Sequence, residues 1–143
     1  MPYEFLGEIA IADAAFEARA ETLEELFVSA ADATLNVMVV DLSTVAETEC
    51  RTIRVESDSV DMLLFALLQE LIYYKDAERL FLRVPKVVIR READRFVLEA
   101  EARGEEIDPA KHDLVVDVKA VTLHRYRVAE TPRGWEALVI LDV

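Results

Sequence analysis

The sequence is poor in the residues that build disulfide frameworks, linkers and tight turns. Its 143 residues include one cysteine, three glycines and four prolines, and no stretch is rich in Ser and Gly. The single cysteine, Cys50, excludes an internal disulfide framework. Because no linker, repeat or low-complexity segment interrupts the chain, we expect one domain over residues 1–143, long enough to bury roughly two-thirds of its unfolded surface.

Long apolar runs and net positive charge are also missing. No apolar leader and no uninterrupted stretch of about 18 apolar residues is present, which predicts a cytoplasmic protein without a membrane partner. The chain has 16 Lys and Arg against 29 Asp and Glu, a formal charge of −13. Such a chain repels phosphate backbones, so we expect no direct nucleic-acid binding. The basic residues between Lys75 and Arg95 are spaced as on a solvated face.

Two segments have helical periodicity. Thr22 and Glu25 form a capping-box pattern, in which each side chain satisfies a free backbone N–H at a helix start. Asp58 and Ser59 are suitable caps for a second helix. The apolar stripes of the two helices are, in order, Leu23, Leu26, Phe27, Ala30, Ala31, Leu35 and Met38, and Val60, Leu63, Leu64, Leu67, Leu68, Leu71 and Ile72.

Most of the remaining chain shows strand patterns. Tyr3 to Arg19 alternates well enough to predict one extended segment, and residues 91–95 and 129–134 resemble hairpin turns. The other predicted strands are 50–55, 80–84, 87–90, 96–102, 114–128 and 135–141. We therefore predict an α+β fold, with two helices packed on one face of a largely antiparallel sheet.

Two aspartates stand in apolar strand patterns. Asp13 and Asp142 each need a cation, a basic partner or water, because an unpaired buried carboxylate costs several kcal/mol or becomes protonated. Exposure at a strand end is the simplest alternative for each. Asp142 precedes Val143, whose carboxylate ends the sequence, so two oxygen donors are adjacent there. Oxygen donors favour Ca²⁺ or Mg²⁺ over Zn²⁺.

The remaining chemically active residues do not form an enzyme motif. A Walker loop, a dinucleotide fingerprint and a Ser/His/Asp pattern are lacking, so composition predicts no enzyme. His124 either forms a hydrogen bond within its sheet or faces a partner or metal. His112 follows Asp108-Pro109, where we expect an exposed turn and no role.

At this point the order of segments resembles a known family. The matching stretches are Tyr-Glu-Phe-Leu at 3–6, Ala12-Asp13, Thr22-Leu-Glu-Glu-Leu-Phe27, Met38 to Val45, Leu68-Gln-Glu70-Leu with Asp76 and Glu78, Gly104-Glu-Glu with Asp108-Pro and His112, Val118-Lys119-Ala-Val-Thr122-Leu-His124, and Val139-Ile-Leu-Asp142-Val. From Tyr3 to Val143 the chain is similar to the archeases, small acidic proteins that activate a GTP-dependent RNA-splicing ligase.

The resemblance implies a metal site and a partner. It suggests that Asp13, Asp142 and the carboxylate of Val143 hold a divalent cation, Ca²⁺ or Mg²⁺. It also points to His124, Lys119 and Glu70 as partner-binding or metal-adjacent residues.

Two departures from the family pattern stand out. The family's first strand carries His-Thr-Ala-Asp, where this chain has Ala10-Ile11-Ala12-Asp13. The tryptophan and acidic residue of its second helix are replaced by Leu67 and Ala66.

The expected function is therefore that of an accessory protein in tRNA splicing and RNA repair. It would promote guanylylation and multiple turnover of the ligase, and it would not itself be an enzyme. Three alternatives stay open: a chaperone-like modulator of a tRNA methyltransferase, a divergent metal-binding paralogue with another protein partner, and a metal-dependent hydrolase. The hydrolase would need a base and a positioned water beside the carboxylates.

Overall fold

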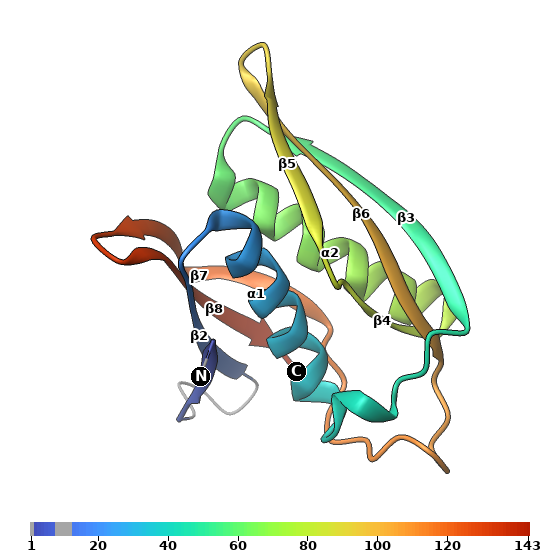
Figure 1. Cartoon of the computed structure of the whole chain (residues 1–143). Coiled ribbons are helices and arrows are strands. Elements are labelled where there is room, and N and C mark those ends of the chain that lie inside the picture. Colours follow the sequence, from blue (N-terminus) through green and yellow to red (C-terminus); the bar gives the residue numbers. More distant parts are fainter. Residues whose placement is uncertain (1, 8–12) are drawn as a thin grey trace.

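The computed structural model describes residues 2–7 and 13–143 (Figure 1). The helical elements in these ranges are α1 (Leu23–Met38), α2 (Val60–Glu78) and a short 3₁₀ turn, η1 (Leu42–Thr44). The strands are β1 (Tyr3–Leu6), β2 (Asp13–Ala20), β3 (Glu49–Ser57), β4 (Leu80–Arg83), β5 (Val87–Glu92), β6 (Arg95–Glu106), β7 (Ala120–Thr131) and β8 (Gly134–Asp142).

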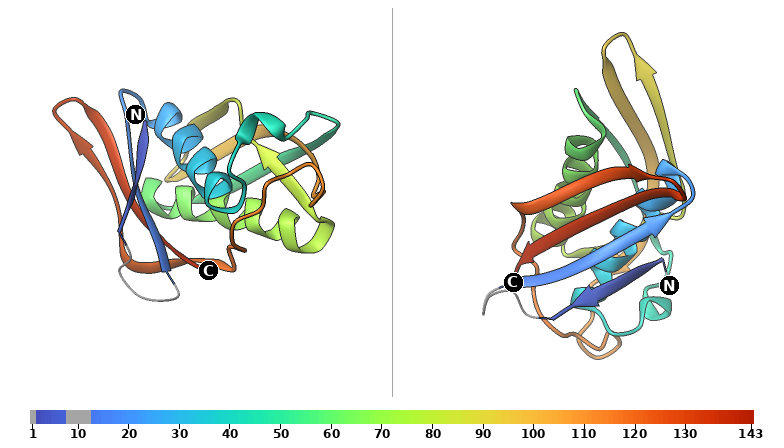
Figure 2. Two further views of the ribbon diagram at one scale, coloured as in Figure 1. Left: turned by 90° about the horizontal axis from the view of Figure 1, so that it is seen from below. Right: turned by 90° about the vertical axis from the view of Figure 1, so that its left-hand side faces the viewer.

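The strands form two antiparallel sheets. The first sheet has the order β1-β2-β8-β7, and in the second sheet β3, β4 and β5 all pair with β6. The two helices lie between the sheets, and each contacts strands of both (Figure 2, left). The α+β class is confirmed. The structure has two sheets where we predicted one. The apolar faces of the helices are wide, and a sheet on each side of the helix layer is needed to bury them.

Helix α1 begins where its sequence predicts. Thr22 is the N-cap, and its hydroxyl accepts a hydrogen bond of 3.1 Å from the backbone N–H of Glu25. At the other helix, Ser59 occupies the N-cap without a side-chain bond, and Arg79 ends the helix in the left-handed conformation. The predicted stripe of α2 faces the core, where Leu63, Leu64, Leu67 and Leu68 are fully buried.

Two predicted strands are wrong in their bounds. Tyr3 to Arg19 is not one extended segment: β1 and β2 are separate strands that pair antiparallel, with Tyr3 opposite Ala18. The strand predicted for 114–128 begins only at Ala120. Residues 117–118 instead contact α2, where the Nζ of Lys75 donates hydrogen bonds to Asp117 and to the carbonyl of Val118.

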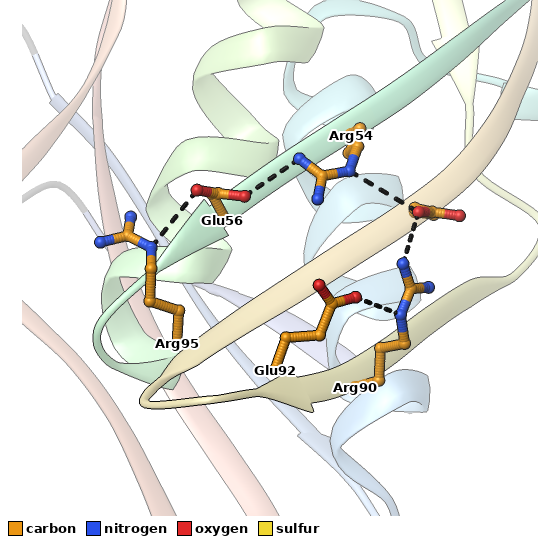
Figure 3. A network of polar contacts seen from close by, with 6 residues as sticks. Arg54, Glu56, Arg90, Glu92 and Arg95 are labelled. Atoms are coloured by element: carbon orange, nitrogen blue, oxygen red, sulfur yellow. Dashed lines mark hydrogen bonds and ion pairs between the residues drawn. The ribbon is translucent and has the colours of Figure 1, made fainter.

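The outer face of the second sheet carries a network of ion pairs. Arg54 and Glu56 of β3, Arg90 and Glu92 of β5, and Glu99 between them link the strands across the surface (Figure 3). These side chains are all exposed, so water screens each pair and its contribution to stability is small. They keep this wide face polar.

Within the described ranges, no helix combines the length and the apolar character needed to cross a membrane.

Candidate functional site

The pairing of β2 with β8 brings two of the three predicted metal ligands together. Asp13 lies directly opposite Asp142 in the antiparallel register. Residues opposite each other on one face of such a pair have Cβ atoms about 4.5–5.5 Å apart. Phe16 and Val139 lie on the core face of these strands, so the period of two places both aspartates on the outer face.

The two half-buried aspartates carry like charge and lie opposite each other in the strand register. Like charges directly opposite on neighbouring strands are destabilising. In the described part of the chain, neither Asp13 nor Asp142 has a basic partner within ion-pair distance. Arg19, at the far end of β2, pairs with Glu17. A divalent cation would relieve this repulsion, and the oxygen-only donor set fits Ca²⁺ or Mg²⁺.

Asp13 lies at an open hollow at one end of the first sheet. Asp13, Val143 and Asn36 line an open pocket of about 410 Å³ together with aliphatic side chains. Among the described residues, no three His, Cys, Asp or Glu side chains are grouped closely enough to hold a metal ion. A cation here would therefore need another donor besides Asp13 and Asp142.

Lys119 lies next to this site, but mainly through its backbone. Its N–H donates a hydrogen bond of 2.8 Å to the carbonyl of Asp142, and its side chain is exposed. This bond, together with the pairing of Ala120 with Asp142, places the start of β7 beside the carboxylate. Segments from three distant parts of the sequence thus meet at one end of the first sheet.

His124 and Glu70 are not brought to the carboxylates by any described hydrogen bond or ion pair. His124 is exposed within an irregular stretch of β7, where the register shifts between Thr122 and Arg127. This bulge contains Arg125 in the left-handed conformation and breaks the strict alternation of faces that the sequence implied. Glu70 is half-buried on α2. The sequence prediction of a role for either residue stays a prediction.

The replaced family motif at residues 10–12 lies outside the described residues. The two replacements on α2 are described: Leu67 is fully buried in the core and Ala66 is half-buried. Leu67 therefore contributes to packing between the sheets.

The prediction for His112 is wrong. It is 1% exposed, and its Nδ1 accepts a hydrogen bond of 2.9 Å from the backbone N–H of Asp108. Nε2 therefore carries the proton and donates to Glu105 at 2.7 Å. The turn after Asp108 is formed as expected, but it directs the imidazole inward against Phe81.

Sequence reasoning also missed the buried Lys75. This side chain is only 5% exposed, and its ammonium group binds Asp76, Asp117 and the carbonyl of Val118, the last at 2.7 Å. Lys75 follows Ile72 by three residues and therefore continues the apolar stripe of α2. This spacing is the one sequence signal that could have identified it as buried.

Comparison with known proteins gives a consistent result. The Archease protein family (MTH1598/TM1083) matches residues 3–143. Protein archease of Pyrococcus abyssi is 34% identical over 133 residues, which are 92% of this chain and 93% of that protein. Protein archease of Methanosarcina mazei is 34% identical over 142 residues, which are 99% and 95% of the two chains.

Two solved structures have the same fold. The solution structure of Methanobacterium thermoautotrophicum protein 1598 superposes with a TM-score of 0.85 at 36% identity, covering 99% of both chains. The Thermotoga maritima protein TM1083, described as an archease and possible chaperone, has a TM-score of 0.62 at 16% identity and covers 94% of this chain and 93% of its own. The second likeness concerns the fold alone. The family match and the relatives, taken with the fold, show that this chain belongs to the archease family.

Proposed function

We propose that this chain is an accessory protein that activates a GTP-dependent RNA ligase in tRNA splicing and RNA repair. In this role it docks on the ligase, promotes guanylylation of the ligase and permits multiple turnover. The observation that carries the proposal is the cross-strand pair Asp13 and Asp142, at an accessible sheet end in a member of the archease family.

The charge of the chain supports a protein partner of opposite sign. A formal charge of −13 favours association with a basic, RNA-binding enzyme and disfavours competition for its RNA. No catalytic role is required of the chain itself in this proposal.

The proposal includes a divalent cation, Ca²⁺ or Mg²⁺, held by Asp13, Asp142 and the carboxylate of Val143. When bound, the cation supplies positive charge at a surface that is otherwise anionic. The residues themselves orient the donors: β-pairing holds the two aspartates in register, and the Lys119 N–H fixes the backbone of Asp142.

Thermal unfolding with added Ca²⁺ or Mg²⁺ tests the cation directly. A ligand that binds only the folded state raises the unfolding temperature. We expect such a rise in the wild type, a much smaller rise in Asp13→Asn, and a smaller rise when two glycines are added after Val143. The matched control is Glu17→Gln, on the same face of β2 and away from the site. Equal responses of all four proteins would contradict the site.

Reconstitution with the GTP-dependent RNA ligase of the same organism tests the proposed function. The measured quantity is covalent guanylate on the ligase, with and without this chain. We expect faster guanylylation and more than one ligation per ligase molecule only in its presence. An unchanged rate would contradict the proposal.

A second candidate is a chaperone-like modulator of a tRNA methyltransferase, favoured by the description of the Thermotoga relative as a possible chaperone. Light scattering from a heated tRNA methyltransferase distinguishes the two roles. Suppressed aggregation without any stimulation of the ligase would support this candidate instead. Phosphoester hydrolysis by the chain alone would support the hydrolase alternative.

A further inference from the structure

An exposed aliphatic segment precedes β7. Leu114, Val115 and Val116 are 43%, 56% and 44% exposed, and Asp113 and Asp117 flank them. Single exposed aliphatic residues are ordinary on protein surfaces, but three in succession form a contiguous apolar patch of the kind that marks interaction sites. We call residues 114–116 the 114–116 edge.

The 114–116 edge is held in place on both sides. The N–H of Val115 donates to the carbonyl of Met38 at 2.9 Å, and the N–H of Val40 donates to the carbonyl of Asp113 at 3.0 Å. Downstream, the buried ammonium group of Lys75 binds Asp117 and the carbonyl of Val118. The segment is therefore ordered in its exposed position, which lowers the entropy cost of binding a partner.

One side of this short ladder is open. Val39 and Leu114 form an antiparallel bridge flanked by the two bonds above, so the peptide groups of Leu114 point away from Val39. In residues 2–7 and 13–143, no hydrogen bond uses the backbone N–H or C=O of Leu114 or Val116. An unpaired edge of this kind is a template for an added strand.

The 114–116 edge separates two hollows. Val115 and Val116 line one pocket of about 390 Å³, which also includes Phe81 and Ile107. The same two valines line the pocket of about 410 Å³ that contains Asp13. An added strand would therefore lie beside two hollows, one of which is lined by Asp13.

The rim of this surface is predominantly acidic. Exposed aspartates surround the edge at Asp41, Asp76, Asp113 and Asp117. The ammonium group of Lys75 is buried and already bound to two of them. Arg79 lines the smaller hollow, together with Asp76 and Asp117. In a chain of charge −13, this surface complements a cationic segment and disfavours a second copy of itself.

We propose that the 114–116 edge binds an extended segment of the partner protein as an additional strand, and that this segment carries aliphatic side chains flanked by Lys or Arg. The proposal deepens the proposed function and rests on it for the identity of the partner, a basic RNA-binding enzyme. The added strand places the partner against the hollow of Asp13 and Val143.

Amide hydrogen exchange in the complex with the RNA ligase tests the strand. In the free chain, we expect the amides of Leu114 and Val116 to exchange fast and that of Val115, which is bonded to Met38, to exchange slowly. We expect amide exchange at Leu114 and Val116 to be at least tenfold slower in the complex, and exchange at Val115 to be almost unchanged. A complex in which Leu114 and Val116 still exchange at the free rate would overturn the proposal.

A pair of valine substitutions provides the matched affinity test. Val116→Asn removes an aliphatic contact from the edge, and Val88→Asn makes the same change at a 46% exposed valine on the second sheet. We expect Val116→Asn to weaken ligase binding at least tenfold, Val88→Asn to change it less than twofold, and both to unfold at nearly the wild-type temperature. Equal affinities of the two variants would count against the edge.

A peptide experiment separates this inference from the proposed function. If the wild type neither binds nor stimulates the ligase, the proposed function fails, and the edge is tested with acetyl-Lys-Val-Ile-Val-Lys-amide against the Glu-flanked analogue. We expect the basic peptide alone to shift the NMR amide signals of Leu114 and Val116. Shifts from neither peptide, equal shifts from both, or a dimer of the chain that Val116→Asn dissociates would overturn the proposal.

Discussion

At the scale of single residues, one carboxylate oxygen of Glu105 contacts three different groups. Its Oε1 accepts a hydrogen bond of 3.0 Å from the N–H of Ala46 and contacts Lys111 and His112, each at 2.7 Å. These contacts, led by the Ala46 N–H, lower the pKa of Glu105 from 4.5 to about 2. The glutamate thereby connects the end of β6 to two loops. The sequence predicted the turn after Asp108 but not the inward direction of His112.

The lowered pKa of Glu105 predicts an acid-sensitive contribution to stability. A carboxyl whose folded pKa lies below its unfolded value contributes stability above pH 4.5, and this is lost as the pH falls from 4.5 towards about 2. We expect the free energy of unfolding of the wild type to fall more steeply over this range than that of Glu105→Gln. Denaturant titrations at several pH values measure this pH dependence of the free energy of unfolding. Glu106→Gln, at the exposed neighbouring position, should retain the wild-type slope, and identical slopes in all three would refute the assignment.

At the scale of elements, local patterns predicted most of the fold. The apolar stripes and the Thr22 cap predicted both helices, and alternation predicted strands at the places of β3 to β6 and β8. The errors lie where contacts with residues distant in the sequence determine the path of the backbone. Lys75 holds residues 117–118 away from the sheet, and the side chain of Gln69 accepts a hydrogen bond of 3.0 Å from the N–H of Val121. Neither contact has a signature in the local sequence.

Because β4 and β6 approach each other closely at Gly104, we predict that the stability of the fold depends strongly on glycine at this position. A Cβ at Gly104 would lie 1.7 Å from the carbonyl oxygen of Phe81, and backbone atoms of a paired strand cannot move aside cheaply. We expect Gly104→Ala to lower the free energy of unfolding by about 2–4 kcal/mol. Gly7→Ala is the control, because no described residue other than its chain neighbours lies within 4 Å of its added Cβ. Chemical denaturation measures both, and similar small losses would refute the close approach.

At the scale of the whole molecule, two sheets enclose the helices and place the candidate site at one end of the first sheet (Figure 2, right). The resemblance named Asp13, Asp142 and Val143, and the register of β2 with β8 puts the two aspartates opposite each other. The 114–116 edge beside them was not predictable. Its sequence is typical of an ordinary strand. Its exposed position depends on tertiary contacts with Met38, Val40 and Lys75.

The formal charge of −13 predicts salt-sensitive association. Acidic steering towards a basic ligase is screened as the Debye length falls below about 8 Å above roughly 0.15 M salt. We expect the association rate in stopped-flow mixing to fall several-fold between about 0.05 and 0.5 M NaCl, while the dissociation rate changes little. An association rate independent of salt would exclude steering by the acidic surface.

The rate of ligase guanylylation in the presence of Asp13→Ala, Asp142→Ala and the double variant tests the central claim most directly. If the two carboxylates act as one unit, each single substitution abolishes most of the stimulation, and the double variant is hardly worse than either. Because both side chains lie on the outer face, thermal stability should stay near that of the wild type. Full stimulation by either single variant, or activity lost only in proportion to stability, would contradict the account.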